Sequence, residues 1–270
     1  MRYQLRYTPS GLSIMAAPGR VKEGMLPPDF PRLFESQHTG FDEDLPLWLA
    51  LAAEAHGPIL ELGCGPGRVL ATLAKAGYDV EGLDYDPEML ARAAQRLAPY
   101  RVPLHCADLC SLTLKRRFAL ILLPCNTFAQ LNDEEAMAML AGARRHLTCG
   151  GRLAAELPHP RESAPLPGHP DEPLTTFFEA ESGNPVQLYA YSTLSPDGRR
   201  VDVLWHYDEL HPDGHVTRTS VGTTFYIRRP RELRRMLKQT GFASVHFFGN
   251  YDRSRYTPRA RRLIVLAQAS

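Results

Sequence analysis

The sequence predicts an α/β fold: a doubly wound, mostly parallel sheet with an antiparallel β insertion after the fifth strand. Short apolar runs alternate with helical patterns between residues 59 and 157, which is typical of a parallel sheet covered by helices. The first of these runs leads through three closely spaced glycines into a helix. From residue 175 to residue 228 the apolar period changes to two, which indicates antiparallel strands.

The composition limits the classes of protein to consider. A chain of 270 residues can bury a full core, and 31 basic against 30 acidic residues give no electrostatic reason to expect nucleic acid or an anionic membrane as partner. No apolar run approaches the roughly 20 residues that a membrane helix needs. The five cysteines show no paired spacing, and the first residues make a poor signal peptide. We therefore expect reduced thiols in a cytoplasmic protein.

The segment before the first strand divides into an arm and a helical cover. Residues 1–28 hold four prolines and show no sustained period, which indicates a loose arm. A helical pattern follows over residues 30–55, and Asp42 or Asp44 is available to cap its second part.

The strongest local signal is the strand, turn and helix around the glycines. Residues 59–62 form a buried strand pattern, and glycines at alternate positions separate it from a helix that starts at Arg68. Glycines let the backbone approach a nucleotide-like ligand at the carboxyl end of a parallel sheet. A dinucleotide site would have its third glycine at position 68, and the carboxylate of Glu61 would repel a pyrophosphate. The turn instead suits a ligand with a positive charge, such as an amino group.

Acidic residues follow the next two strands. Residues 78–84 form a second strand that ends in Asp84, and an acid there can accept hydrogen bonds from ribose hydroxyls. Asp86, followed by a proline, opens the next helix as its cap. A third strand and its exit cover residues 102–109 and include Asp108, which alone would be a turn or cap residue.

The fourth strand is the uninterrupted apolar run of residues 118–125, as expected for a parallel strand covered on both faces. Asn126 begins its exit. A helix starts at Asn132, and Glu135 stands three residues later, close to a capping-box pattern. Residues 152–157 supply a fifth strand.

The second half of the chain adds the insertion and completes the sheet. Six prolines mark residues 158–173 as a linker. Four strand patterns separated by turns that contain proline and glycine predict a four-stranded antiparallel meander. A helix opened by Pro230 and strands at residues 244–249 and 262–268 complete the pattern.

The pattern E-x-G-x-G-x-G from Glu61 to Gly67 resembles motif I of the class I S-adenosylmethionine-dependent methyltransferases, and the run from Gly82 to Leu90 resembles the second motif of that family. The resemblance covers roughly residues 30–268 and implies a Rossmann-like, doubly wound, seven-stranded fold. Together with the residue patterns, it divides the chain into four parts: a loose N-terminal arm (1–28), a cofactor-binding core with a helical cap (29–157), a β insertion that acts as lid or dimer surface (174–228), and a C-terminal helix and β-hairpin (229–270).

The resemblance also implies roles for individual residues. Glu61 and the glycines would hold the amino-acid end of S-adenosylmethionine, Asp84 its ribose and Asp108 its adenine. The expected cofactor contacts are Glu61, Gly63, Cys64, Gly65, Gly67, Asp84, Tyr85, Asp108, Leu109 and Pro124. The expected acceptor contacts are Phe34, His38, Asn126, Phe128, Gln130 and Tyr207, with Asn126 orienting the acceptor.

Alternatives stay open for several of these residues. For Phe34 and His38 the other interpretation is a packing helix with a solvent-facing histidine, and for Tyr207 it is a half-buried aromatic face of the sheet. A turn or cap role is the other interpretation of Asn126. Gln130 stands where small-molecule methyltransferases often carry a histidine. The resemblance to that family therefore does not imply a general base at position 130. No grouping of histidine, cysteine and acidic residues has the spacing of a metal site.

The implied function is transfer of a methyl group from S-adenosylmethionine to a nitrogen or oxygen of a small molecule, with S-adenosylhomocysteine as product. The sulfonium is already activated, so in-line alignment in a dry pocket can supply most of the acceleration. Three alternatives remain: another transfer from the same cofactor, such as aminopropyl transfer, a nicotinamide-dependent oxidoreductase, and a non-catalytic cofactor-binding protein. The expected partners are a small-molecule methyl acceptor and a second copy of the chain, paired at an open edge of the insertion. No nucleic acid or membrane partner is expected.

Overall fold

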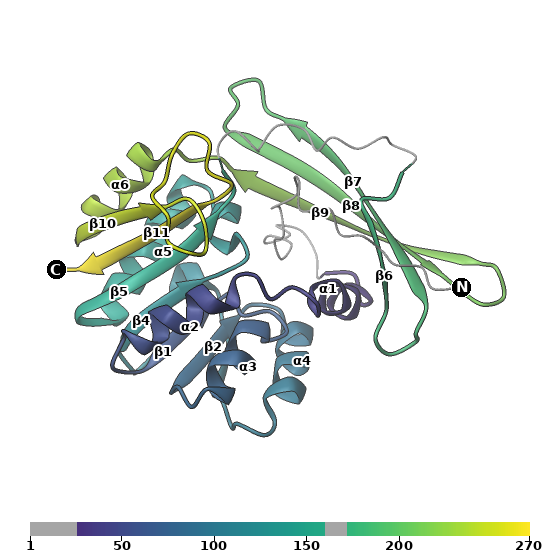
Figure 1. The fold of residues 1–270 in the computed structure, drawn as a ribbon, viewed down its shortest axis with the longest axis horizontal. Coiled ribbons are helices and arrows are strands. Elements are labelled where there is room, and N and C mark those ends of the chain that lie inside the picture. The colour runs from purple at the N-terminus through teal and green to yellow at the C-terminus, as the bar shows by residue number, and fades with distance from the viewer. Residues whose placement is uncertain (1–25, 160–171) are drawn as a thin grey trace.

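The computed structural model describes residues 26–159 and 172–270, and it contains two sheets (Figure 1). The larger sheet has seven strands in the order β10-β11-β5-β4-β1-β2-β3. Its parallel strands are β1 (Ile59–Leu62), β2 (Val80–Asp84), β3 (Leu104–Cys106), β4 (Phe118–Leu123) and β5 (Leu147–Leu157). The strands β10 (Phe242–Phe248) and β11 (Leu263–Ala269) continue the sheet beyond β5 in antiparallel pairing. The predicted seven-stranded, mostly parallel sheet is therefore confirmed.

Helices cover both faces of this sheet, as a doubly wound fold requires. On one face lie α2 (Leu45–Ala53), α3 (Arg68–Lys75) and α4 (Pro87–Leu97), and on the other lie α5 (Asp133–His146) and α6 (Pro230–Gln239). Leu120 and Leu122 of β4 belong to the first core, whereas Ile121 and Leu123 belong to the second. Successive side chains of a strand point to opposite faces, and this explains why the whole strand is apolar.

Two predicted helix starts are confirmed by their capping contacts. The carboxylate of Asp86 accepts hydrogen bonds from the amides of Glu88 and Met89, both at 2.9 Å. At the start of α5, the amide of Glu135 donates to Asn132 at 2.9 Å and the Glu135 carboxylate accepts from the Asn132 amide at 2.9 Å. These starts are readable from sequence because each signal lies within four residues.

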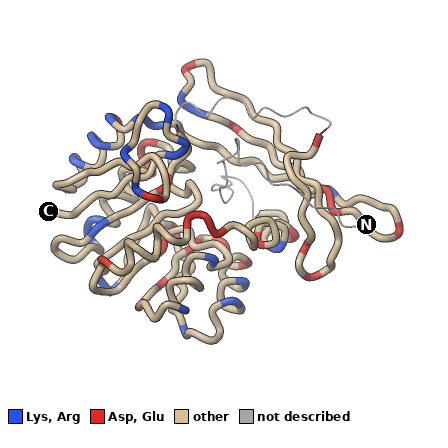
Figure 2. Tube along the Cα trace, in the orientation of Figure 1, with Lys and Arg blue, Asp and Glu red and all other residues tan. Residues whose placement is uncertain are grey.

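The N-terminal cover consists of two helices, α1 (Phe30–His38) and α2, joined by a short acidic loop that stands out in Figure 2. Asp44 precedes α2, but its side chain makes no capping hydrogen bond. It binds Trp48 and Arg68 instead, so the expected capping role is wrong. The predicted arm and the proline-rich linker fall largely on residues 1–25 and 160–171, outside the described residues.

The insertion is a four-stranded antiparallel sheet in the order β6-β7-β8-β9, as predicted. Its strands are β6 (Thr175–Phe178), β7 (Pro185–Leu194), β8 (Arg200–Leu210) and β9 (Val216–Tyr226). One face of this sheet packs on α1 in a separate core, where Val203 and Trp205 meet Phe30 and Leu33. Figure 1 shows α1 next to these strands and beside α4, and the carboxylate of Glu35 in α1 accepts hydrogen bonds from Arg92 and Arg96 of α4.

Charged residues of both signs are interspersed over the described part of the chain (Figure 2). None of the described helices has both the length and the apolar character needed to cross a membrane.

Candidate functional site

The glycine turn after β1 has a backbone that only glycine adopts without strain. Gly63, Gly65 and Gly67 have φ values of 70°, 50° and 78°. Gly63 is also closed to any side chain, because a Cβ atom there would lie 2.5 Å from Cγ2 of Thr127. Thr127 belongs to the short helix η2 (Thr127–Gln130) that follows β4. The turn therefore packs the end of β1 directly against the exit of β4.

Asp84, the last residue of β2, is turned toward the glycines. Its carboxylate accepts hydrogen bonds from the amides of Gly65 at 2.8 Å and Asp86 at 3.0 Å. Burial raises the pKa of Asp84 to about 6, although these amide donors act in the opposite direction. Each carboxylate oxygen has a second lone pair, so Asp84 can still accept hydrogen bonds from the hydroxyls of a ligand.

Glu61 is a buried acid in β1, two residues before the first glycine. Burial raises its pKa to about 8, although the positive charge of Arg68 favours the ionised form. Its Oε2 atom makes no hydrogen bond within the described part of the chain. A nearby cation would favour the ionised form of this buried carboxyl group, and the amino group of a ligand would supply such a cation.

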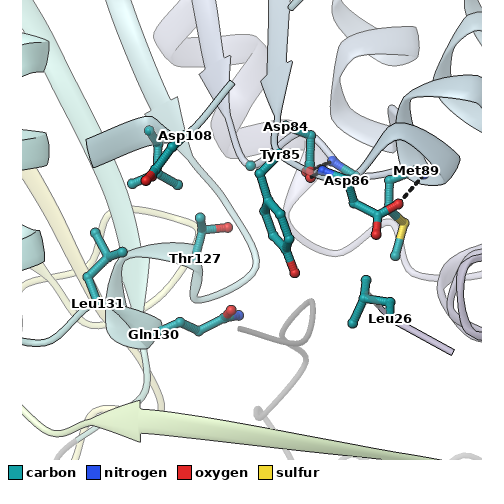
Figure 3. Close-up of a pocket in the computed structure, with 12 residues that line it drawn as sticks. Leu26, Asp84, Tyr85, Asp86, Met89, Asp108, Thr127, Gln130 and Leu131 are labelled. Carbon is teal, nitrogen blue, oxygen red and sulfur yellow. Dashed lines mark hydrogen bonds between the residues drawn. The ribbon is translucent and has the colours of Figure 1, made fainter. Parts of the chain in front are cut away.

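A cavity of about 270 Å³ opens at the carboxyl ends of β1, β2 and β3. In Figure 3, the ring of Tyr85 reaches into it between Asp84 and Gln130. Its walls consist of Leu26, Gly63, Gly65, Asp84, Tyr85, Asp86, Met89, Asp108, Leu109, Thr127, Gln130 and Leu131. Crevices at the carboxyl ends of the strands are where open α/β sheets bind ligands.

The cavity brings together six of the residues expected to contact the cofactor: Gly63, Gly65, Asp84, Tyr85, Asp108 and Leu109. The other four, Glu61, Cys64, Gly67 and Pro124, do not line it. Glu61 and Cys64 are buried beneath the turn. Gly67 lets α3 approach α4, since a Cβ atom there would lie 3.3 Å from Ala93. The individual contacts with a bound cofactor stay predictions.

Of the expected acceptor contacts, only Gln130 lines the cavity. The rings of Phe34 and His38 on α1 lie with their centroids 4.0 Å apart and their planes tilted by 34°, and Phe34 lies close to Gly65. Burial lowers the pKa of His38 to about 4, so its imidazole is neutral at physiological pH. The Tyr207 hydroxyl donates to Gln37 at 2.7 Å, and this contact fits the packing interpretation.

Asn126 and Phe128, the remaining expected acceptor contacts, are buried on either side of Thr127. Neither lines the cavity, although Thr127 does. The guanidinium of Arg228 lies 5.5 Å from the centroid of the Phe128 ring. Phe128 therefore has a packing partner outside the cavity.

Sequence reasoning missed five residues of the cavity wall: Leu26, Asp86, Met89, Thr127 and Leu131. A signal existed for Asp86 and Met89, because a helix that begins right after the second strand turns its first residues toward the strand end. Leu26 falls in the segment predicted to be a loose arm, and nothing in its local sequence indicates that it lines a cavity. Among the described residues, no group of three or more histidine, cysteine or acidic side chains is placed to hold a metal ion.

Comparison with known proteins agrees with this geometry. The sequence model of a protein family described as a methyltransferase domain matches residues 59–151. The cypemycin N-terminal methyltransferase of Streptomyces sp is 25% identical over 211 residues, which cover 78% of this chain and 82% of that enzyme.

Two solved structures share the fold. An S-adenosylmethionine-dependent methyltransferase from Clostridium acetobutylicum ATCC 824 has a TM-score of 0.73 at 15% identity, covering 90% of this chain and 98% of that one. The sugar N-methyltransferase KedS8 from Streptoalloteichus sp ATCC 53650 has a TM-score of 0.73 at 20% identity, covering 94% of this chain and 98% of that one.

The domain match covers the strand ends that form the cavity, from the glycine turn through Asp84 and Asp108 to η2. The seven-stranded sheet around them has the order and directions of the fold that the sequence implied. Residues 59–151 accordingly form a methyltransferase domain, and the chain has the fold of the class I S-adenosylmethionine-dependent methyltransferases, with S-adenosylmethionine as the methyl donor.

Proposed function

We propose that this enzyme methylates a nitrogen atom of a small molecule. The observation that carries the proposal is Gln130 in the cavity wall, because a glutamine side chain cannot take up a proton. A hydroxyl acceptor needs a base as the new bond forms, whereas an amine that arrives neutral already has a nucleophilic lone pair. The wall is therefore better suited to nitrogen than to oxygen.

The acids of the described wall are already engaged by backbone amides. Asp84 accepts two such hydrogen bonds, Asp86 caps α4, and Asp108 accepts from the amide of Cys110 at 2.9 Å. Carboxylates held in this way are arranged to bind and orient a ligand. They are less suited to moving toward an acceptor hydroxyl and taking its proton.

The residues present fit S-adenosylmethionine. When bound, it supplies a methyl group activated on a sulfonium. We assign Glu61 to its amino group, because the buried Oε2 atom has no hydrogen-bond partner among the described residues and a bound ammonium would favour the ionised carboxylate. Asp84 serves the ribose hydroxyls and Asp108 the adenine, and the glycine turn leaves room for the backbone to approach.

The protein acts by alignment. It holds the acceptor nitrogen in line with the methyl carbon and the sulfur, so that the nitrogen–carbon bond forms as the carbon–sulfur bond breaks. The ammonium product then loses its proton to water. Asn126, buried next to Thr127 of the wall, is proposed to orient the acceptor.

The names of related proteins support a nitrogen acceptor. The relative from Streptomyces is described as an N-terminal methyltransferase and KedS8 as a sugar N-methyltransferase. We further propose that the sheet β6–β9 serves as a lid over the acceptor, because it packs on α1 and one end of β9 lies against η2. A homodimer through this sheet and a cytoplasmic location stay predictions.

The test is an assay of S-adenosylhomocysteine release with matched acceptors, in which each amino sugar or peptide amine is paired with its hydroxyl analogue. We expect product with amines alone, and mass spectrometry should place the methyl group on nitrogen. Methylation of the hydroxyl partner would contradict the proposal. Parallel calorimetric titrations should show micromolar binding of S-adenosylmethionine and S-adenosylhomocysteine and none of NADH.

A further inference from the structure

We propose that Arg68 and Asp44 are positioning residues for methyl transfer. They hold the backbone of Cys125 and Asn126 at the exit of β4, and neither of them lines the cavity that receives the donor. The inference rests on the proposed function in one respect, since it takes the exit of β4 as the acceptor side of the site.

Arg68 is fixed from several directions. Its guanidinium donates to both carboxylate oxygens of Asp44, at 2.7 Å and 2.6 Å, in a bidentate pair. It also donates to the carbonyl of Phe41 at 2.9 Å and lies 5.0 Å from the centroid of that ring. Asp44 is fully buried and accepts from the indole of Trp48 at 2.8 Å. The pair therefore forms a rigid unit that joins α2 to the first residue of α3.

This unit reaches the exit of β4 through one further contact. The Nη2 atom of Arg68 donates to Sγ of Cys125 at 3.3 Å. Burial raises the pKa of the Cys125 thiol to about 12, so the sulfur accepts this bond as a neutral group. The charge of Arg68 is balanced by Asp44, and its contact with Cys125 serves to place the side chain.

The backbone at this point needs such support. Cys125 and Asn126 have φ values of 52° and 60°, and two consecutive non-glycine residues in this region are unusual. Such a conformation is strained for a non-glycine residue and persists only when the surroundings enforce it. On the other side of the turn, the hydroxyl of Thr127 donates to the carbonyl of Pro124 at 2.8 Å. Arg68 supplies the side-chain anchor at Cys125 itself.

The turn at Cys125 and Asn126 determines where two residues of the cavity wall lie. Thr127 and Gln130, which come directly after it, line the cavity. A change in φ at Cys125 or Asn126 would shift both, and a misplacement of about 1 Å can cost roughly 10²-fold in rate. Donor binding depends chiefly on the ends of β1 and β2, so it should be much less affected.

The decisive comparison is between two substitutions at one position. Cys125→Ala and Cys125→Gly both remove the sulfur that Arg68 holds, but only glycine adopts positive φ freely. We expect Cys125→Ala to lower kcat at least tenfold and Cys125→Gly to lower it less than threefold. Arg68→Lys should lower kcat at least tenfold alone and less than threefold in the Cys125→Gly background. The dissociation constant for S-adenosylmethionine, from calorimetry, should stay within threefold throughout.

Trp48→Phe is the matched control, because it loosens Asp44 and α2 without touching the contact to Cys125. An equal loss of kcat in this control would overturn the proposal, as general loosening would then suffice. Equal losses in Cys125→Ala and Cys125→Gly would overturn it too. A loss confined to donor affinity would assign the pair to cofactor binding instead.

A second readout needs no acceptor. The chain has four asparagines, Asn126, Asn132, Asn184 and Asn250, so selective ¹³C labelling resolves the signal of Asn126. We expect Cys125→Ala to move the Asn126 Cα and Cβ shifts away from left-handed values, and Trp48→Phe to leave them in place. Unchanged shifts in Cys125→Ala would overturn the inference even if no amine substrate is found. A failed amine panel with the expected shifts would count against the proposed function alone.

Discussion

Among single residues, Glu61 has a pKa near 8 in the folded protein because burial disfavours its charge, whereas its ordinary value is 4.5. Between these values the folded protein holds a proton that the unfolded chain has lost. The free energy of unfolding should therefore fall as pH rises from about 4.5 to about 8. Glu61→Gln should remove this dependence. Urea unfolding at pH 6.5 and pH 8.5 measures it, since one pKa unit corresponds to about 1.4 kcal/mol.

This pH window separates Glu61 from Asp84, whose raised pKa of about 6 acts with the same sign at lower pH. Asp84→Asn serves as the control and should keep the slope between pH 6.5 and pH 8.5. A wild-type protein whose stability is flat over that range would show that Glu61 is already ionised. The affinity of Glu61→Gln for S-adenosylmethionine should fall at least tenfold if the carboxylate pairs with its amino group.

Gly63 allows a second test at the residue scale, because two costs add at this position. Its φ of 70° strains any side chain, and a Cβ atom would meet Thr127 at 2.5 Å. Gly77 has a φ of 86° and open space around it, so it isolates the first cost. Gly77→Ala should destabilise the protein by about 1 kcal/mol. Gly63→Ala should destabilise it by at least about 1 kcal/mol more and abolish donor binding. Equal losses, measured by thermal unfolding, would mean that Thr127 moves aside without cost.

At the scale of elements, Glu209 connects β8 to α1. Burial alone would raise the pKa of Glu209. Hydrogen bonds from Arg32, Asn184 and Ser182 outweigh this effect and lower the pKa to about 2. The contribution of Glu209 to the free energy of unfolding is therefore fully present above pH 4.5 and is lost as pH falls toward 2. Glu209→Gln should cost on the order of 1–3 kcal/mol at pH 7 and much less at pH 3.

The control for this prediction is Asp202→Asn in the same strand, whose ion pair with Arg200 is exposed. It should change the free energy of unfolding by less than about 0.5 kcal/mol at either pH. If Glu209→Gln were equally harmless, α1 would be held to the insertion without help from the Arg32–Glu209 ion pair.

The elements differ in how far they could be predicted from sequence, and the reason is the reach of each signal. The strand β1, its glycine turn and the start of α4 are specified within a few residues, and all are as predicted. The local pattern offers Asp44 as a helix cap. It cannot show the actual partner, Arg68, because Arg68 lies 24 residues further along the chain. Likewise, no local pattern shows that Thr127 would occupy the space left by Gly63. Contacts between distant segments decide these roles.

On the scale of the whole molecule, the cavity lies where parts with different cores meet. Leu26 and Met89 belong both to its wall and to the core that the insertion shares with α1, whereas Leu109 and Leu131 pack with the main sheet. A ligand that touches both sides should therefore couple them. To enclose the ligand, α1 must stay packed on the insertion, because the chain from Leu26 leads directly into that helix.

Hydrogen exchange measured with and without S-adenosylmethionine can test this coupling. At 100 times the dissociation constant the ligand should add about 2.7 kcal/mol to the free energy of unfolding. We expect the largest local protection at residues 63–67 and 84–89, and also at the start of α1, which lies far from the glycines in sequence. NADH should protect none of these segments. Protection limited to the glycine turn and the end of β2 would mean that α1 moves independently of the donor, and that the wall at Leu26 closes only with the methyl acceptor.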